Sequence, residues 1–248
     1  TFAVRQYLQA GTNTVSVRVY DPAQDKIKIP RWFHDPKPLE NQPPFEAELL
    51  PHGKQEWYYN VGGIWQDVQL IAVAAAYIKQ VKITPDIHTG TAQVQVEIAG
   101  DDAGAALTVE IDGQKATTGL VAGQSSYSAA IQIPSPQLWT PETPHLYSAS
   151  VTLDNGDSIS EKFGFREIKI HKGQLLLNGE PIILLSALDQ DFYPDTIYTV
   201  PSDDFLRDQF KKAKELGLNS LRCHIKVPDP RYLDLADEIG LLIWSKIP

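Results

Sequence analysis

Hydrophobic and polar positions alternate with a period of two at the start of the chain, a spacing that predicts β-strands. Within residues 1–76 the alternation runs over Val15, Val17 and Val19 and returns over Gln66–Leu70. Between these stretches, prolines from Pro22 to Pro51 interrupt the hydrogen-bond ladder that a sheet needs, so we expect a long loop there. The region therefore predicts a β-sheet domain whose first strands lie outside this chain.

Short alternating stretches recur about every ten residues across residues 77–170, a spacing typical of sandwiches. These stretches are Val81/Ile83, Val94/Val96/Ile98, Leu107/Val109/Ile111, Ile131/Ile133, Val151/Leu153 and Phe163/Phe165. Asp112-Gly113 and Asn155-Gly156 punctuate them, and both dipeptides favour hairpin turns that need a positive φ. The pattern predicts an immunoglobulin-like β-sandwich, without the inter-sheet disulfide because Cys223 is the only cysteine.

Residues 171–248 change to helical spacing. Leu175–Leu177, Asn178-Gly179 and Pro181–Leu185 predict a hairpin that leads into an apolar strand. Ser202 is expected to cap a helix that ends at Gly217, since aspartates follow the cap and apolar residues recur at helical intervals.

A second helix is expected between Asp229, with proline after it, and Gly240. We expect a strand over Ser220–Cys223 before this helix and an apolar strand over Leu241–Trp244 after it. The order strand–helix–strand–helix–strand predicts a parallel α/β unit. A (β/α)8 barrel takes about 250 residues, so we expect most of such a barrel to lie beyond Pro248.

Composition narrows the classes of function. The 248 residues are 42% hydrophobic and carry a net charge of −9, which disfavours nucleic acid or an anionic membrane as partner. The longest apolar run, Leu70–Ile78, is too short to cross a bilayer. The sequence has one cysteine and its histidines are scattered, so we find no motif for a metal or a cofactor in it. Because the chain starts at Thr1 and contains no Met, we expect it to be a piece of a longer protein, truncated at both ends. Its localisation stays open between cytoplasmic, periplasmic and secreted.

Five motifs in chain order resemble glycoside hydrolase family 2, the family of β-galactosidases, β-glucuronidases and β-mannosidases. They are Gly62–Leu70 (GGIWQDVQL), Leu138–Tyr147 (LWTPETPHLY), Gly164–Arg166 followed by Leu177–Pro181 (GFR, LNGEP), Asn219–Arg222 (NSLR) and Asp237–Leu242 (DEIGLL). The resemblance covers nearly the whole chain. Within these motifs we expect Trp65, Trp139 and Tyr147 to be packing residues and Asn178-Gly179 to be turn chemistry alone.

The resemblance implies a multidomain β plus α/β fold. Residues 1–76 would form a partial jelly-roll β-sandwich of the sugar-binding type, and residues 77–170 the immunoglobulin-like β-sandwich. Residues 171–248 would form the first third of a TIM-barrel catalytic domain, whose sites lie at the carboxyl ends of the strands. We therefore look for ligand-binding residues after the predicted parallel strands.

Asp189 and Gln190 follow the first of these strands and are candidates for hydrogen bonds to sugar hydroxyls. The alternative is an aspartate that caps the loop beside a solvated glutamine. The family often has an Asn-x-His cluster here, and this sequence resembles a branch that reads LDQ instead. Both assignments stay open at this point.

Arg222, His224 and Lys226 follow the second strand, and period-2 alternation would put them on one face. Arg222 matches the arginine that lines the family's active site, with a structural ion pair as the alternative. Many relatives read RxSHYP, so their histidine falls on Ile225 and their serine on His224, which leaves the role of His224 open. Lys226 either reaches the pocket or is solvated. At the third strand, Lys246 stands where relatives commonly have an acidic residue.

The resemblance implies a retaining exo-β-glycosidase of carbohydrate metabolism, which hydrolyses O-glycosidic bonds of terminal β-linked sugars with two glutamates. In the family these glutamates follow the fourth and seventh barrel strands. We therefore assign no catalytic residue here and expect the chain alone to be inactive. Asp189 and Asp191 make a poor substitute pair, because they follow the strand rather than lie within it, and we expect their side chains to point to opposite sides.

The alternative function is that of a non-catalytic carbohydrate-binding or scaffold piece. In that case Trp32, Phe33 and Trp57 in the proline-rich segment would stack on sugar faces. Either hypothesis has a carbohydrate as partner and requires no cofactor, and the oligomeric state stays open.

Overall fold

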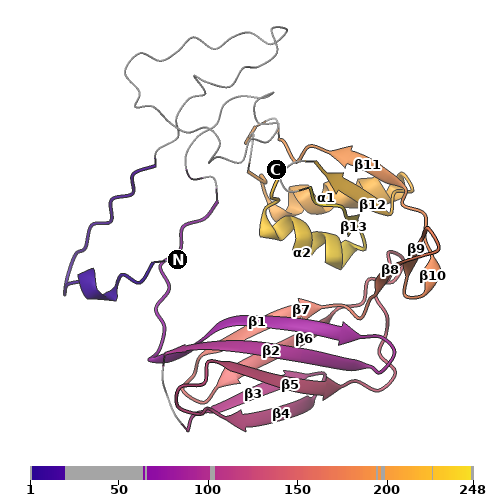
Figure 1. Cartoon of the computed structure of the whole chain (residues 1–248). Coiled ribbons are helices and arrows are strands. Elements are labelled where there is room, and N and C mark those ends of the chain that lie inside the picture. Colours follow the sequence, from indigo (N-terminus) through magenta and orange to yellow (C-terminus); the bar gives the residue numbers. More distant parts are fainter. Residues whose placement is uncertain are drawn as a thin grey trace, which may run out of the picture. The chain divides into compact units, whose positions relative to one another are not determined.

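The computed structural model describes residues 2–19, 64, 66–100, 104–193, 195–196, 199–224 and 226–246 (Figure 1). The chain divides into two compact units, residues 1–67 and 68–248. Its secondary structure is mostly β-sheet with few helices, as the sequence predicts. The predictions for Trp32, Phe33, Trp57, Trp65 and the proline-rich loop fall outside the described residues.

The two strands predicted for residues 1–76 are not formed. Residues 2–19 contain a short 3-10 helix, η1 (Arg5–Tyr7), and no strand. Val15, Val17 and Val19 are exposed, and so are Val68 and Leu70 in the second predicted strand. A strand needs a hydrogen-bonded neighbour, and neither stretch has one among the described residues. Alternation without a partner is therefore not enough to form a sheet.

Two antiparallel sheets build the central part of the chain. One has the order β1 (Ala76–Asp86), β2 (Thr91–Gly100), β5 (Ser126–Gln132). The other has the order β4 (Gln114–Gly119), β3 (Ala106–Ile111), β6 (Tyr147–Leu153), β7 (Ser158–Phe163). Alternate side chains of both sheets form one buried core, in which Val94, Val96, Val109, Ile111 and Val151 are almost fully inaccessible to solvent. The strands expected from the alternation are thus present (Figure 1), and their buried side chains form one core.

Strand β4 was missed by the sequence pattern, because its residues are almost all polar and exposed. It pairs with β3 through the predicted Asp112-Gly113 turn, where both residues have positive φ, 49° and 77°. The turn chemistry was therefore a better signal for this edge strand than its hydrophobicity, since one strand of a hairpin requires the other.

A small antiparallel sheet follows, with the order β10 (Glu180–Pro181), β9 (Gln174–Leu177), β8 (Ile168–His171). Asn178 and Gly179 form its turn with φ of 53° and 88°, as predicted. Asn178 does more than turn the chain, however. Its side chain accepts a hydrogen bond from the Glu167 amide (2.9 Å) and donates one to the Trp139 carbonyl (3.0 Å). The expectation of turn chemistry alone is therefore wrong.

The last part of the chain is a parallel sheet with the order β11 (Ser186–Asp189), β12 (Ser220–Cys223), β13 (Leu242–Ile243). Helix α1 (Asp203–Glu215) joins the first two strands, and α2 (Pro230–Ile239) joins the last two. This confirms the predicted parallel α/β order. The first strand begins at Ser186, beyond the predicted Pro181–Leu185, where Ile183 and Leu185 are exposed.

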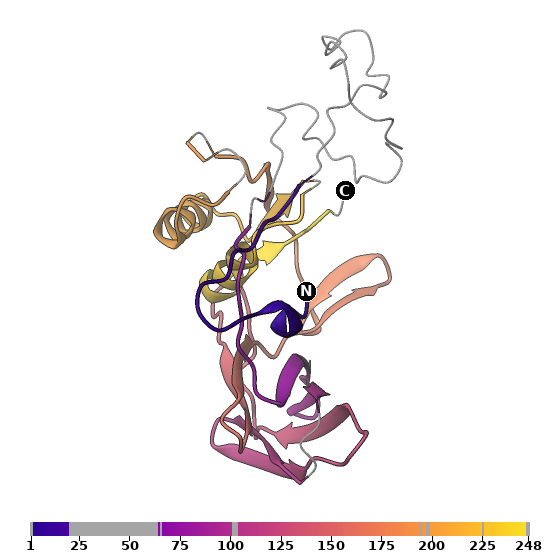
Figure 2. The same ribbon diagram turned by 90° about the vertical axis from the view of Figure 1, so that its left-hand side faces the viewer.

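The caps of both helices are those expected from the sequence. The Ser202 hydroxyl accepts a hydrogen bond from the Phe205 amide (3.1 Å), and Asp229 accepts one from the Arg231 amide (3.0 Å). Gly217 and Gly240 end the helices with φ of 81° and 88°. The helices pack against each other through the rings of Phe210 and Tyr232, 4.9 Å apart, and lie side by side in both views (Figures 1 and 2).

Trp139 joins the antiparallel sheets to the α/β part. The indole is fully buried, and its Nε1 donates a hydrogen bond to the Asp237 carbonyl in α2 (2.8 Å). The Arg166 guanidinium lies 4.6 Å from the ring centroid and forms an ion pair with Asp237 (2.8 Å). Lys214 of α1 donates hydrogen bonds to the carbonyls of Pro141 and Ile239. Trp139 is thus a packing residue, as expected.

The division into domains at residues 76 and 170 stays a prediction. Residues 68–248 form a single compact unit, consistent with the contacts of Trp139 and Arg166 across the second boundary. Among the helices that the structure describes, none has the length and apolar character needed to cross a membrane.

Candidate functional site

The carboxyl ends of β11, β12 and β13 lie at one edge of the parallel sheet. The register pairs Asp189 with Cys223 and Leu221 with Ile243, so the residues that follow each strand come together. The chain places most of the predicted site residues there. This edge is where α/β folds build binding sites, because the loops that follow the strands converge on it.

Asp189 is held by protein donors on both carboxylate oxygens. Its Oδ1 accepts a hydrogen bond from the Asp191 amide (2.7 Å). Its Oδ2 accepts one from the Tyr232 hydroxyl of α2 (2.7 Å) and one from Nε2 of Gln209 in α1 (3.4 Å). Burial, followed by the nearby Asp189 charge, raises the pKa of Tyr232, so its hydroxyl stays protonated and donates. Asp189 therefore caps the loop, the alternative that the sequence left open, and also joins the strand end to both helices.

Asp191 and Lys226 form a buried ion pair. Their side chains are 0% and 2% exposed, and Nζ of Lys226 lies 2.9 Å from Oδ2 of Asp191. The same ammonium donates a hydrogen bond to the backbone carbonyl of Asp191 (2.6 Å). On the other carboxylate oxygen, Asp191 accepts a hydrogen bond from the Tyr193 hydroxyl. Burial and the Asp191 hydrogen bond raise the pKa of Tyr193, which keeps that hydroxyl a donor.

The predicted alternation of Arg222, His224 and Lys226 on one face is not observed. Strand β12 ends at Cys223, so the two-residue period no longer applies at positions 224 and 226. Arg222 and His224 are half-buried, whereas Lys226 turns into the protein and is 2% exposed. The pairing of Lys226 with Asp191 was missed, because the two residues are 35 positions apart and meet only through the parallel sheet.

Arg222 and Trp244 form the more open part of this edge. The Arg222 guanidinium carbon lies 5.9 Å from the centroid of the Trp244 ring, within the range of a cation–π contact. Trp244 follows β13 and is 57% exposed. Gln190 and His224 are half-buried, and the His224 amide donates a hydrogen bond to the Asp189 carbonyl (3.0 Å). Arg222 thus lies at the open part of the edge beside the exposed Trp244, whereas the side chains of Asp189 and Lys226 are engaged within the protein.

The end of β13 is joined to the same network through its backbone. The Lys246 amide donates a hydrogen bond to the Cys223 carbonyl (3.1 Å), and its carbonyl accepts one from the Lys226 amide (3.2 Å). The Cys223 thiol is buried and points at the Lys226 carbonyl, 3.8 Å away. In the part of the chain that the structure describes, no three His, Cys, Asp or Glu residues group in a way that suits a metal ion.

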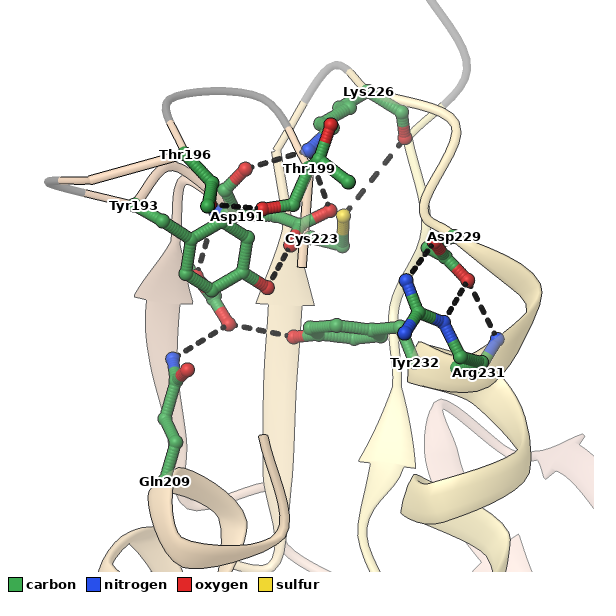
Figure 3. Close-up of polar contacts among 11 residues, drawn as sticks. Asp191, Tyr193, Thr196, Thr199, Gln209, Cys223, Lys226, Asp229, Arg231 and Tyr232 are labelled. Carbon is green, nitrogen blue, oxygen red and sulfur yellow. Dashed lines mark hydrogen bonds and ion pairs between the residues drawn. The ribbon is translucent and has the colours of Figure 1, made fainter. Parts of the chain in front are cut away.

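A second polar cluster fixes the start of α2 next to this edge (Figure 3). Arg231 donates hydrogen bonds to both carboxylate oxygens of Asp229 and forms an ion pair with Asp203 of α1 (3.2 Å). The Arg231 side chain lowers the pKa of Asp229, so the cap stays ionised at neutral pH. Both helix starts are therefore tied together beside the strand-end loops.

Known proteins with similar sequences are glycosidases. Residues 76–166 match the model of glycosyl hydrolases family 2. The chain is 27% identical to a β-galactosidase of Photobacterium profundum and 28% identical to a putative β-glucuronidase of Formosa agariphila, with 99% of this chain aligned in each case. The aligned part is 23% and 22% of those relatives, so the chain spans about a quarter of their length.

The solved structures give the same result. A family 2 β-galacturonidase from Eisenbergiella tayi, bound to galacturonate, has a TM-score of 0.63 and 25% identity, covering 71% of this chain and 33% of that one. A β-glucuronidase from Bacteroides uniformis has a TM-score of 0.62 and 27% identity, covering 75% of this chain and 24% of that one. In fold and in sequence, the chain is thus similar to glycoside hydrolases. The resemblance to glycosyl hydrolases family 2 is confirmed, and the match to the family model covers residues 76–166.

Proposed function

We propose that this chain is part of a retaining exo-β-glycosidase that hydrolyses the O-glycosidic bonds of terminal β-linked sugars. The observation that carries the proposal is the edge of the parallel sheet, where Arg222, His224 and Gln190 gather in a chain aligned over 99% of its length with β-galactosidases and β-glucuronidases. The catalytic glutamates are expected outside these 248 residues, so the chain contributes binding and support.

The two antiparallel sheets around one core support an immunoglobulin-like sandwich, and the parallel strands with their helices support the start of a TIM barrel. In this arrangement the strand ends form part of the wall of the pocket. Residues 1–76 remain our candidate for a partial jelly roll on the basis of the family motif alone.

Of the five proposed substrate-binding residues, Lys226 is buried and the other four are half-buried, and the Asp189 carboxylate is held by Tyr232, Gln209 and the Asp191 amide. The three that remain as candidate sugar ligands are Arg222, His224 and Gln190. We propose that they donate hydrogen bonds to the hydroxyl groups of the terminal sugar, with the Arg222 charge held in place over Trp244. The Asp189 carboxylate already accepts a hydrogen bond from Tyr232, and the Lys226 ammonium is already paired with Asp191. We therefore assign them an indirect role, in which they fix the loops that carry the sugar-binding residues.

The test compares the protein from the complete reading frame with residues 1–248 alone. Both are assayed against 4-nitrophenyl β-galactoside, β-glucuronide, β-galacturonide and β-mannoside. We expect the complete protein to cleave at least one of them and residues 1–248 to cleave none. Proton NMR of the first-formed free sugar should show the β-anomer, since two displacements retain the configuration. The α-anomer as first product would overturn the retaining mechanism.

The site is tested with Arg222→Ala in the complete protein. Loss of a charged hydrogen-bond donor to the substrate should lower kcat/KM by about tenfold or more. Arg5→Ala, at an exposed position in η1, is the matched control and should leave the rate unchanged. Turnover by residues 1–248 that Asp189→Asn abolishes would show that the catalytic carboxyl lies inside this chain, contrary to the proposal.

The alternative function, a non-catalytic carbohydrate-binding piece, is tested by the same comparison of the complete protein with residues 1–248. Binding of an oligosaccharide to residues 1–248, measured by calorimetry, with no turnover by the complete protein would replace the enzyme by a binding module. The aromatic residues that this alternative uses lie outside the described residues, so no contact in the structure favours it.

A further inference from the structure

Lys226 connects the loops that follow all three parallel strands. Its ammonium reaches the loop after β11, with 2.6 Å to the Asp191 carbonyl and 2.9 Å to the Asp191 carboxylate. Its own amide donates a hydrogen bond to the Lys246 carbonyl after β13 (3.2 Å). Lys226 itself belongs to the loop after β12. A single buried residue therefore joins three loops from distant parts of the sequence, and Figure 3 shows its contacts with Asp191.

Asp191 is held in an uncommon backbone conformation at the other end of this ion pair. Its φ is +51°, the left-handed region that a non-glycine residue adopts when its surroundings enforce it. Three groups enforce it here: the Lys226 ammonium, the Tyr193 hydroxyl on the carboxylate, and the Asp189 carboxylate on the amide. The conformation of this loop thus depends on the charge of Lys226.

The residues proposed to bind the sugar are next to this ion pair. Gln190 precedes Asp191, and His224 lies two positions before Lys226 and is bonded through its amide to the Asp189 carbonyl. Removing one charge of a buried pair leaves the other uncompensated, so the loops would rearrange to solvate it. Gln190 and His224 would move with them.

We propose that Asp191 and Lys226 are positioning residues, and that their buried ion pair sets the placement of Gln190 and His224 for the terminal sugar. This inference rests on the proposed glycosidase function. It also revises the sequence-based role of Lys226, from a direct sugar ligand to a residue that acts through the strand-end loops. Asp191 acquires a role that the motifs did not indicate.

The experiment is a double-mutant cycle in the complete protein, with Lys226→Gln, Asp191→Asn and the double variant. Asparagine and glutamine keep hydrogen-bonding groups at both positions while removing both charges. Each single variant should lower kcat/KM for the cleaved 4-nitrophenyl β-glycoside by about tenfold or more, and the double variant should recover to within about threefold of the unmodified protein. All rates are measured below the unfolding transition of every variant.

Lys212→Gln is the matched control for the removal of a lysine charge. Lys212 forms an i,i+4 ion pair with Asp208 on α1, and both side chains are more than 60% exposed. Its kcat/KM should equal that of the unmodified protein. Urea midpoints measured in parallel should fall in both buried single variants, recover in the double variant and stay unchanged in Lys212→Gln.

Tyr193→Phe keeps the test available if the single variants of the pair do not fold. It removes only the hydroxyl that donates to the Asp191 carboxylate, and it should lower kcat/KM by about threefold or more while the protein stays folded. An unchanged rate and an unchanged urea midpoint for Tyr193→Phe would overturn the positioning role.

The outcomes separate the two proposals. If Lys226 contacted the sugar directly, Lys226→Gln would lower kcat/KM by the same factor whether residue 191 is aspartate or asparagine. The effects of the two single variants on kcat/KM would then add in the double variant. Such additive losses in an active protein would overturn the positioning role alone. No turnover of any β-glycoside by the unmodified protein would overturn the proposed function, and the positioning role with it.

Discussion

Replacing Gly240 by alanine should destabilise the protein more than the same change at Gly217. Both glycines end a helix in the left-handed region, with φ of 88° and 81°. They differ in their surroundings. A methyl group at Gly217 would meet no atom within 4 Å, whereas one at Gly240 would overlap the Pro141 carbonyl oxygen and lie 3.0 Å from its carbon.

The expected magnitudes follow from these two environments. The left-handed conformation costs alanine about 1–2 kcal/mol at either position. At Gly240 the overlap adds about 1–3 kcal/mol, because the Pro141 carbonyl is backbone and cannot rotate away as a side chain would. Alanine also lowers the conformational entropy of the unfolded chain, which stabilises the folded protein by a similar amount in both variants. This contribution therefore cancels when the two variants are compared. Gly240→Ala should therefore lose at least about 1 kcal/mol more than Gly217→Ala.

The assay is urea unfolding followed by circular dichroism at neutral pH, with the unmodified protein and both variants measured together. A lower midpoint with an unchanged slope reports a change in stability. Equal midpoints for the two variants would refute the reasoning, since they would show that the Pro141 carbonyl does not clash with a methyl group at position 240. A larger loss for Gly217→Ala would contradict it as well.

Two further predictions test local features of the same α/β part. Ser202→Ala removes the oxygen that accepts from the Phe205 amide and should cost about 1 kcal/mol, measured as a lower urea midpoint, with Ser202→Asn as the variant that retains the cap. Hydrogen bonds from Lys162 and Arg207 lower the pKa of Glu238 below its usual value, so its contribution to stability is present above about pH 4.3 and is lost as the pH falls through the lower folded-state pKa. Glu238→Gln should therefore destabilise the protein by about 1 kcal/mol or less at pH 7, and its stability should decline less steeply on acidification; a parallel decline in both proteins would contradict this.

The ends of the two helices could be predicted from the sequence because they depend on nearby residues. Ser202 and Asp229 satisfy amides within three positions, and Gly217 and Gly240 adopt a backbone conformation that other residues disfavour. The hairpin turn at Asp112-Gly113 is local in the same sense. The parallel order of the last strands also followed, since helices of this length between apolar strands permit little else.

Predictions failed where an element needed a distant partner. The alternation of Val15, Val17 and Val19 describes a strand, yet no neighbouring strand pairs with it among the described residues. Strand β4 shows the reverse case, because its polar residues predict no strand but hydrogen bonds from β3 make one. Pairing, rather than alternation, decides whether a segment joins a sheet.

Residue types and their order determined which residues gather at the carboxyl edge of the parallel sheet, because Asp189 ends β11, Arg222 is the next-to-last residue of β12, and Lys226 lies in the loop after β12. Only the tertiary structure decided what each of them does there. The sheet brings Asp191 and Lys226 within 2.9 Å across 35 positions, in a site where water cannot solvate either charge. An unpaired ion is costly in such a place, so the two side chains pair with each other, and Lys226 points into the protein while Arg222 stays near its surface.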